Sequence, residues 1–109
     1  MNLIFWFRKV WQRHGPKRHI IIVESDTPPD PIPSRHVYLC HDDGVNWSVA
    51  MRCPCGCGDS LELMLLKEIK PNWSLITIDQ QPPSLKPSIW RRTGCQSHFW
   101  LRNGHIHWC

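Results

Sequence analysis

Residues 53–58 read Cys53-Pro54-Cys55-Gly56-Cys57-Gly58, which places three cysteines at alternate positions in one short loop. A free cysteine behaves as a small hydrophobe, and core packing gives no reason to cluster three of them. Pro54 stiffens this loop, and the two glycines permit the positive φ that lets backbone amides turn toward sulfur. The stretch therefore indicates a metal-ligand cluster.

A second segment near the C-terminus, Cys95-Gln96-Ser97-His98, supplies further donors. A structural zinc site needs four nitrogen or sulfur donors, which proteins commonly deliver as short-spaced groups from distant parts of the chain. Five side chains are available for the four positions, and they are Cys53, Cys55, Cys57, Cys95 and His98. We expect one Zn²⁺ held by four of these five, and the sequence does not identify the surplus one.

Disulfide bonding is the alternative, because a short chain with 6 cysteines can also be a stapled secreted domain. Cysteines at alternate positions are awkward to pair with one another. The N-terminus also lacks the charged, apolar and small-residue order of a secretory leader, so we expect a cytoplasmic chain whose thiols stay reduced. Both points favour metal ligation over disulfides, and the clustering of the cysteines argues against the remaining alternative, buried free thiols.

Size and composition limit the architecture. A chain of 109 residues and 12.9 kDa forms one small domain, and a metal bound only in the folded state can add on the order of 10 kcal/mol to such a domain. The 10 prolines argue against long helices. We therefore expect a mostly β, single-domain antiparallel β-sheet protein stapled by one zinc site, with residues 20–109 as the zinc-binding β domain.

Turn residues predict two hairpins. Asp43-Gly44 separates apolar runs at 36–40 and 45–51, and Asn103-Gly104 separates runs at 99–102 and 105–108. A β-branched run at 20–24 predicts a strand that would be fully buried if it were central. Further strands are predicted at 61–66 and 73–78, with a turn at 79–83. Residues 84–90 carry Pro87 and predict an edge or irregular strand.

Residues 1–19 combine an apolar head with a basic tail. Leu3–Phe7 is too short to cross a bilayer, which takes about 20 apolar residues. Contact of residues 1–14 with a membrane surface is the less favoured reading, and a packed strand or helix ended by Gly15-Pro16 is favoured. The net charge of +4, without a dense basic stripe or a known module, argues against a nucleic-acid partner.

Five motifs in order carry a resemblance to a known family. They are Cys53–Asp59, Pro71-Asn72-Trp73, Ser84–Arg91, Gly94–Trp100 and Arg102-Asn103-Gly104 with Trp108-Cys109. In these motifs the chain resembles a small bacterial family, long carried as a domain of unknown function, found beside ubiquitin-like modifiers and their E1-like and E2-like enzymes. The resemblance covers roughly residues 20 to 109. It implies bound zinc and the role of peptidase in those modifier systems.

Two mechanisms would suit a peptidase. A catalytic zinc needs an open coordination position and a base, for which Glu24 and Glu62 are the candidate carboxylates, with Asp59 as a partner of His98. Sites rich in thiolates usually close, which counts against this route. The other mechanism keeps zinc structural and uses Ser88 or Ser97 as nucleophile. The base is then sought among other histidines, at positions 36, 41, 105 and 107.

Two functional hypotheses follow. The first is a zinc-containing peptidase that processes or removes a ubiquitin-like modifier. The alternative is a zinc-stabilised adaptor that cuts nothing and binds the modifier or its E1/E2-like enzymes, with Trp90 and Trp100 as anchors. Aromatic anchors are typical of interface centres.

Overall fold

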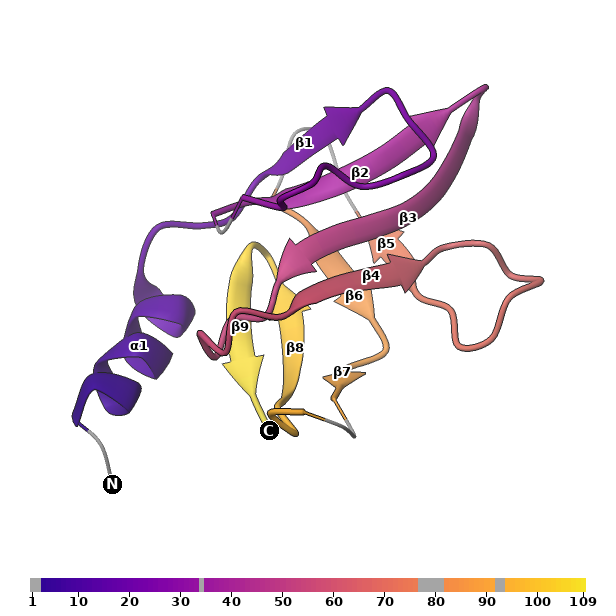
Figure 1. Ribbon diagram of the computed structural model, residues 1–109. Coiled ribbons are helices and arrows are strands. Elements are labelled where there is room, and N and C mark those ends of the chain that lie inside the picture. Colours follow the sequence, from indigo (N-terminus) through magenta and orange to yellow (C-terminus); the bar gives the residue numbers. More distant parts are fainter. Residues whose placement is uncertain (1–2, 34, 77–81, 92–93) are drawn as a thin grey trace.

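A computed structural model describes residues 3–33, 35–76, 82–91 and 94–109. The chain is mostly β, as the sequence predicts, with one short helix at its start (Figure 1). The elements in order are α1 (Leu3–His14), β1 (Ile20–Val23), β2 (Val37–Asp42), β3 (Val45–Arg52), β4 (Ser60–Met64), β5 (Ser74–Ile76), β6 (Ser84–Lys86), β7 (Ile89–Trp90), β8 (His98–Arg102) and β9 (His105–Trp108).

The first sheet has the strand order β1-β2-β3-β4. Its centre is the predicted hairpin, in which Asp43 and Gly44 take φ of 52° and 74° between β2 and β3. Strand β1 pairs parallel to β2, whereas β2, β3 and β4 pair antiparallel. Because β1 lies at the edge of the sheet, Ile21 and Ile22 are 40% and 59% exposed. The run at 20–24 is therefore a strand, but it is not a buried central one.

The second layer contains a β5-β6 pair and a β7-β8-β9 sheet. The predicted closing hairpin is confirmed, because Asn103 and Gly104 adopt positive φ between β8 and β9. Residues 84–90 do not form one strand, since the chain is interrupted at Pro87 and continues as β7. The predicted turn at 79–83 lies mostly outside the described residues.

Figure 1 shows the two layers, and the main core cluster is formed by side chains from both of them. Fully buried side chains come from β3, where Val49 and Met51 alternate along the strand, and from β8, where Phe99 and Leu101 do the same. Tyr38 and Ala50 belong to a separate cluster with Ile32. The proline-rich connector between β1 and β2 supplies Ile32 to that cluster.

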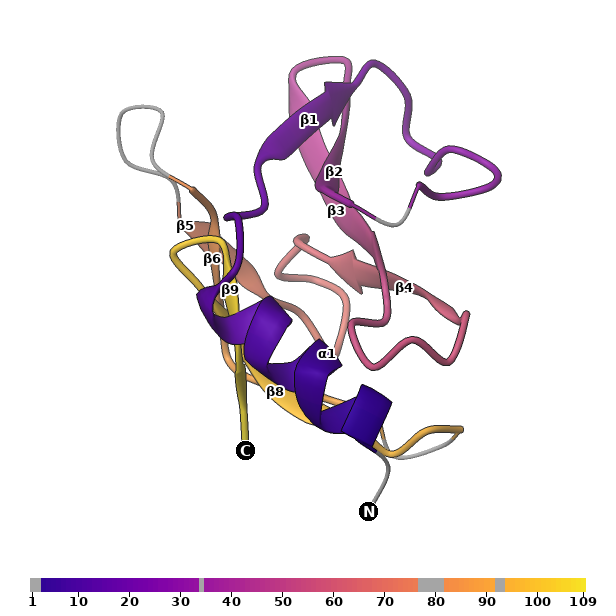
Figure 2. The ribbon, with the colours of Figure 1, turned by 90° about the vertical axis from the view of Figure 1, so that its left-hand side faces the viewer.

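Helix α1 packs along β9, as Figures 1 and 2 show. Lys9 Nζ lies 5.4 Å from the centre of the Trp108 ring, and Arg13 Nη1 lies 2.8 Å from His107 Nδ1. The helix ends at the predicted place, where Gly15 N donates to Trp11 O at 2.7 Å. Among the described residues, no helix is both long enough and apolar enough to span a bilayer.

Candidate functional site

Four thiols converge between the two layers. The Sγ atoms of Cys53, Cys55, Cys57 and Cys95 all lie within 4.8 Å of one another. Sγ of Cys53 lies 3.4 Å from that of Cys55 and 3.6 Å from that of Cys95. A tetrahedral zinc with Zn–S bonds of about 2.3 Å separates its sulfurs by about 3.8 Å. These four side chains can therefore hold a metal ion without a donor from His98.

Local backbone structure brings the four sulfurs together. The loop after β3 closes on itself, because Cys53 N donates to Asp59 O at 2.9 Å and Gly56 N donates to Cys53 O at 3.2 Å. Gly56 and Gly58 both have φ of 89°, a conformation that costs glycine nothing. Cys95 comes from the connection between β7 and β8. The cluster thus ties a loop of the first sheet to a loop of the last one.

Arg91 sits beside the cluster and pairs with Asp59. Its Nη2 donates to Asp59 Oδ2 at 3.1 Å, and its Nη1 lies 3.6 Å from Cys95 Sγ and 3.9 Å from Cys57 Sγ. Burial alone would lower the pKa of Arg91. Its hydrogen bond to Asp59 and its contacts with Cys53 and Cys95 raise the pKa by more than burial lowers it, so the net change is a rise. From the sequence, Asp59 is expected to be a partner of His98. In the structure, Asp59 instead forms an ion pair with Arg91.

The thiols differ in how readily they lose a proton. Burial raises the pKa of Cys53 to about 12. Burial also acts to raise the pKa of Cys95, but hydrogen bonds from Ser97 and from the neighbouring thiols outweigh it and lower the pKa to about 6. Without a metal, Cys95 thus loses its proton more readily than Cys53.

His98 lies against Ser88. Its Nε2 is 2.8 Å from Ser88 Oγ, and both side chains are half-buried. The pairing of β7 with β8 produces this contact, because Trp90 and His98 are cross-strand partners and Ser88 directly precedes β7. The rings of Trp90 and His98 are stacked, with centroids 5.1 Å apart and an interplanar angle of 16°.

A serine hydroxyl within hydrogen-bond reach of an imidazole is the arrangement of a base-activated nucleophile, for which about 2.6–3.2 Å is the working range. In the described part of the chain, no carboxylate hydrogen-bonds to the ring of His98. The imidazole is instead oriented by its strand, by the Trp90 ring and by Ser88. The structure therefore presents a Ser–His pair beside a four-cysteine cluster.

The other candidate residues from the sequence lie elsewhere. Glu62 is on β4 and accepts a hydrogen bond from Ser48 Oγ at 2.9 Å. Glu24 is exposed just after the edge strand β1. Ser97 Oγ lies 3.2 Å from Cys95 Sγ, so its hydroxyl belongs to the cysteine cluster. The structure places none of these three in a hydrogen bond with His98.

The spacing of His98 from Cys95 in the sequence does not indicate its contact with Ser88. The pattern Cys95-x-x-His98 is that of a metal half-site, and it favours reading the histidine as a ligand. The sequence singles out Ser88 as one of two serine candidates, and its base is sought there among the histidines at positions 36, 41, 105 and 107. The register of β7 with β8 brings His98 within hydrogen-bond distance of Ser88.

A family model described as "Bacterial ubiquitination-like system serine protease (BubE)" matches residues 23–109. The match spans the four cysteines of the cluster, Ser88 and His98. No curated protein and no solved structure matches the chain significantly.

Proposed function

The chain belongs to the family of bacterial ubiquitination-like system serine proteases, and from that premise we propose that Ser88 is its nucleophile and His98 its general base. The observation that carries this assignment is the 2.8 Å separation of Ser88 Oγ and His98 Nε2. The substrate we propose is a ubiquitin-like modifier, either extended at its C-terminus or attached to a target.

The proposed reaction follows from the two side chains. Ser88 Oγ attacks the carbonyl carbon of the scissile bond while its proton passes to His98 Nε2, and the imidazolium then protonates the leaving amine. This leaves the modifier's C-terminus esterified to Ser88. A water molecule, deprotonated by His98, then hydrolyses the ester and regenerates the free hydroxyl. The stacked Trp90 ring limits rotation of the imidazole during both proton transfers.

We propose zinc as the metal of the four-cysteine cluster, with a structural role. Four thiolates fill the tetrahedral positions and leave none open for water. A mechanism with Glu24 or Glu62 as base to a metal-bound water would need such an open position. The ion would fix the loop that leads into β8, since Cys95 precedes His98 by three residues. Reduced thiols suit a reducing compartment, and we expect the cytoplasm.

A hollow of about 810 Å³ extends from Pro87, the residue before Ser88, toward the β8–β9 turn. Ile76, Leu85, Pro87 and Trp100 form its apolar part. An extended peptide tail is the kind of ligand that fits such a hollow between short strands. We propose that this hollow receives the modifier's tail as it approaches Ser88.

The test is incubation of the purified protein with a ubiquitin-like modifier that carries a C-terminal extension, followed by intact mass. We expect the wild-type protein and the Ser60→Ala control to release the extension, and the Ser88→Ala variant to release none. A Ser97→Ala variant distinguishes the two candidate nucleophiles. Cleavage by Ser88→Ala at the wild-type rate would overturn the assignment.

A binding role without catalysis is the second candidate, favoured by the 55% exposure of Trp90 at the site. In that case the wild-type protein would form a complex with the modifier, or with its E1-like or E2-like enzymes, and the modifier's mass would not change. The same incubation, analysed by size-exclusion chromatography, separates the two roles.

A further inference from the structure

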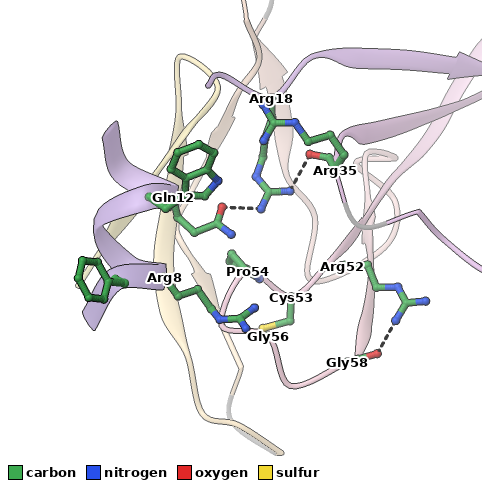
Figure 3. Close-up of a pocket in the computed structure, with 11 residues that line it drawn as sticks. Arg8, Gln12, Arg18, Arg35, Arg52, Cys53, Pro54, Gly56 and Gly58 are labelled. Atoms are coloured by element: carbon green, nitrogen blue, oxygen red, sulfur yellow. Dashed lines mark hydrogen bonds between the residues drawn. The ribbon is translucent and has the colours of Figure 1, made fainter. Parts of the chain in front are cut away.

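A second hollow, of about 660 Å³, lies between helix α1 and the cysteine loop. Figure 3 shows the residues that line it. Its described lining includes four arginines, namely Arg8, Arg18, Arg35 and Arg52, and no aspartate or glutamate. We call this hollow the arginine pocket. The proposed catalysis does not use this hollow, and the four thiols do not need it in order to hold a metal ion.

Arg18 forms the buried wall of the arginine pocket and is only 4% exposed. Its Nη2 donates to Gln12 Oε1 at 2.6 Å, and its Nη1 donates to Arg35 O at 3.2 Å. Burial and the neighbouring charge of Arg35 lower its pKa to about 10, so Arg18 keeps its charge at neutral pH. Arg18 therefore places a desolvated positive charge in the wall of the pocket.

Arg8 reaches into the same space from helix α1, as Figure 3 shows, and lies over Gly56. A side chain at position 56 would collide with the Arg8 guanidinium. The glycine that shapes the cysteine loop therefore also leaves room for this arginine. Helix and loop are fitted to each other around the pocket.

Arg52 and Arg35 are anchored by neutral acceptors. Arg52 donates to Ile32 O at 2.7 Å and to Gly58 O at 3.1 Å, and Arg35 donates to Lys17 O at 3.4 Å. These carbonyl groups orient the guanidinium groups and leave their charge in place. The lining thus concentrates positive charge without supplying a carboxylate.

The negative charge of the thiolate cluster neutralises at most part of the positive charge of these arginines. A divalent ion with four thiolates carries a net charge of about −2, whereas four positively charged guanidinium groups line the pocket. Arg91, whose Nη1 lies 3.6 Å from Cys95 Sγ, does not line the pocket and already has Asp59 as partner. An anionic ligand would meet this positive lining.

We propose that the arginine pocket binds the carboxylates of an acidic peptide segment from a partner protein. Guanidinium groups bind carboxylates through paired hydrogen bonds. Phe7 and Trp11 add an apolar wall, which suits a peptide better than a bare inorganic ion. The proposal goes beyond the peptidase activity and does not rest on it, because the pocket is lined by neither Ser88 nor His98.

The test uses fluorescence anisotropy with the full-length, metal-loaded protein. The probe is a labelled hexapeptide that alternates glutamate with phenylalanine, and its matched control has glutamine in place of glutamate. We expect binding of the glutamate peptide to weaken about tenfold or more in Arg8→Gln and in Arg35→Gln. The control variant Lys70→Gln, which removes one positive charge outside the pocket, should stay within about twofold of wild type.

Three results would overturn the proposal. Equal binding of the glutamine peptide would remove the carboxylates from recognition, and equal weakening by Lys70→Gln would reduce it to diffuse charge. The third result is that the peptide does not bind through Arg8 and Arg35, whereas inorganic phosphate or vesicles with anionic phosphatidylglycerol do. This result would assign the pocket to phosphate groups. Arg8 and Arg35 are both exposed, and circular dichroism with zinc analysis checks that each variant is folded.

Discussion

Ser88 Oγ and His98 Nε2 lie 2.8 Å apart because the two-residue strand β7 aligns Trp90 with His98 on the neighbouring strand. The pair is built by a β ladder between segments on either side of Cys95. The loop that carries this cysteine connects the two strands. Cys95 thus lies in the connection between the two strands whose pairing forms the Ser–His contact.

His98→Gln should separate the role of base from that of metal ligand. We expect kcat to fall about 10²- to 10⁴-fold, the usual contribution of a positioned general base. Zinc content measured by mass spectrometry should stay the same as in the wild-type protein, because four cysteines complete the cluster. Loss of the metal together with activity would return His98 to the ligand set.

Substitution of any cluster cysteine, such as Cys95→Ser, should give the opposite pattern. We expect the zinc content to drop and the free energy of unfolding to decrease by several kcal/mol, since structural zinc can supply on the order of 10 kcal/mol. Cys109→Ser, at an exposed cysteine outside the cluster, is the matched control and should keep both. Elemental analysis and urea denaturation measure the two effects.

Thiol reactivity should reveal the charge distribution once the metal is removed with a chelator. With a pKa of about 6, Cys95 should react with iodoacetamide before Cys53, whose pKa is about 12. The thiolate form of Cys95 is lost as the pH falls through its pKa. Its alkylation rate should therefore be nearly constant above about pH 7 and fall about tenfold per pH unit well below 6. Peptide mapping that finds Cys53 modified first would contradict this order.

The hairpins could be predicted from sequence because their signals are local. Asp43-Gly44 and Asn103-Gly104 require positive φ, and the flanking runs alternate as strands do. The clustering of cysteines at 53–57 with Cys95 was equally visible, since thiols so closely spaced have few other uses. These features depend on residues near one another in the chain, or on one distant partner.

The Ser–His pair and the arginine pocket could not be predicted in this way. Whether His98 faces the thiols or Ser88 depends on the register of a two-residue strand, which carries almost no periodic signal. The four arginines are spread from position 8 to position 52, and only the packing of α1 near the cysteine loop gathers them. The edge position of β1 is likewise fixed by pairing, because an apolar run reads the same at an edge as at a centre.

The two hairpin glycines offer a last test, because they share a backbone conformation but differ in surroundings. Gly44 has φ of 74°, and a Cβ added there would meet nothing within 4 Å. Gly104 has φ of 78°, and a Cβ added there would lie 2.8 Å from both Arg18 O and Pro82 Cβ. Gly104 also accepts a hydrogen bond from Arg18 N at 2.8 Å. The β8–β9 turn therefore holds the backbone of the arginine that walls the pocket.

Gly44→Ala should lower the free energy of unfolding by about 1 kcal/mol, the cost of a left-handed alanine. Gly104→Ala should cost about 1–3 kcal/mol more, because its methyl group meets backbone that cannot move aside cheaply. Urea denaturation of the metal-loaded variants measures the difference. Equal decreases in the free energy of unfolding would mean that residues 17–18 move aside at little cost. In that case the binding of the acidic peptide to Gly104→Ala should also stay unchanged.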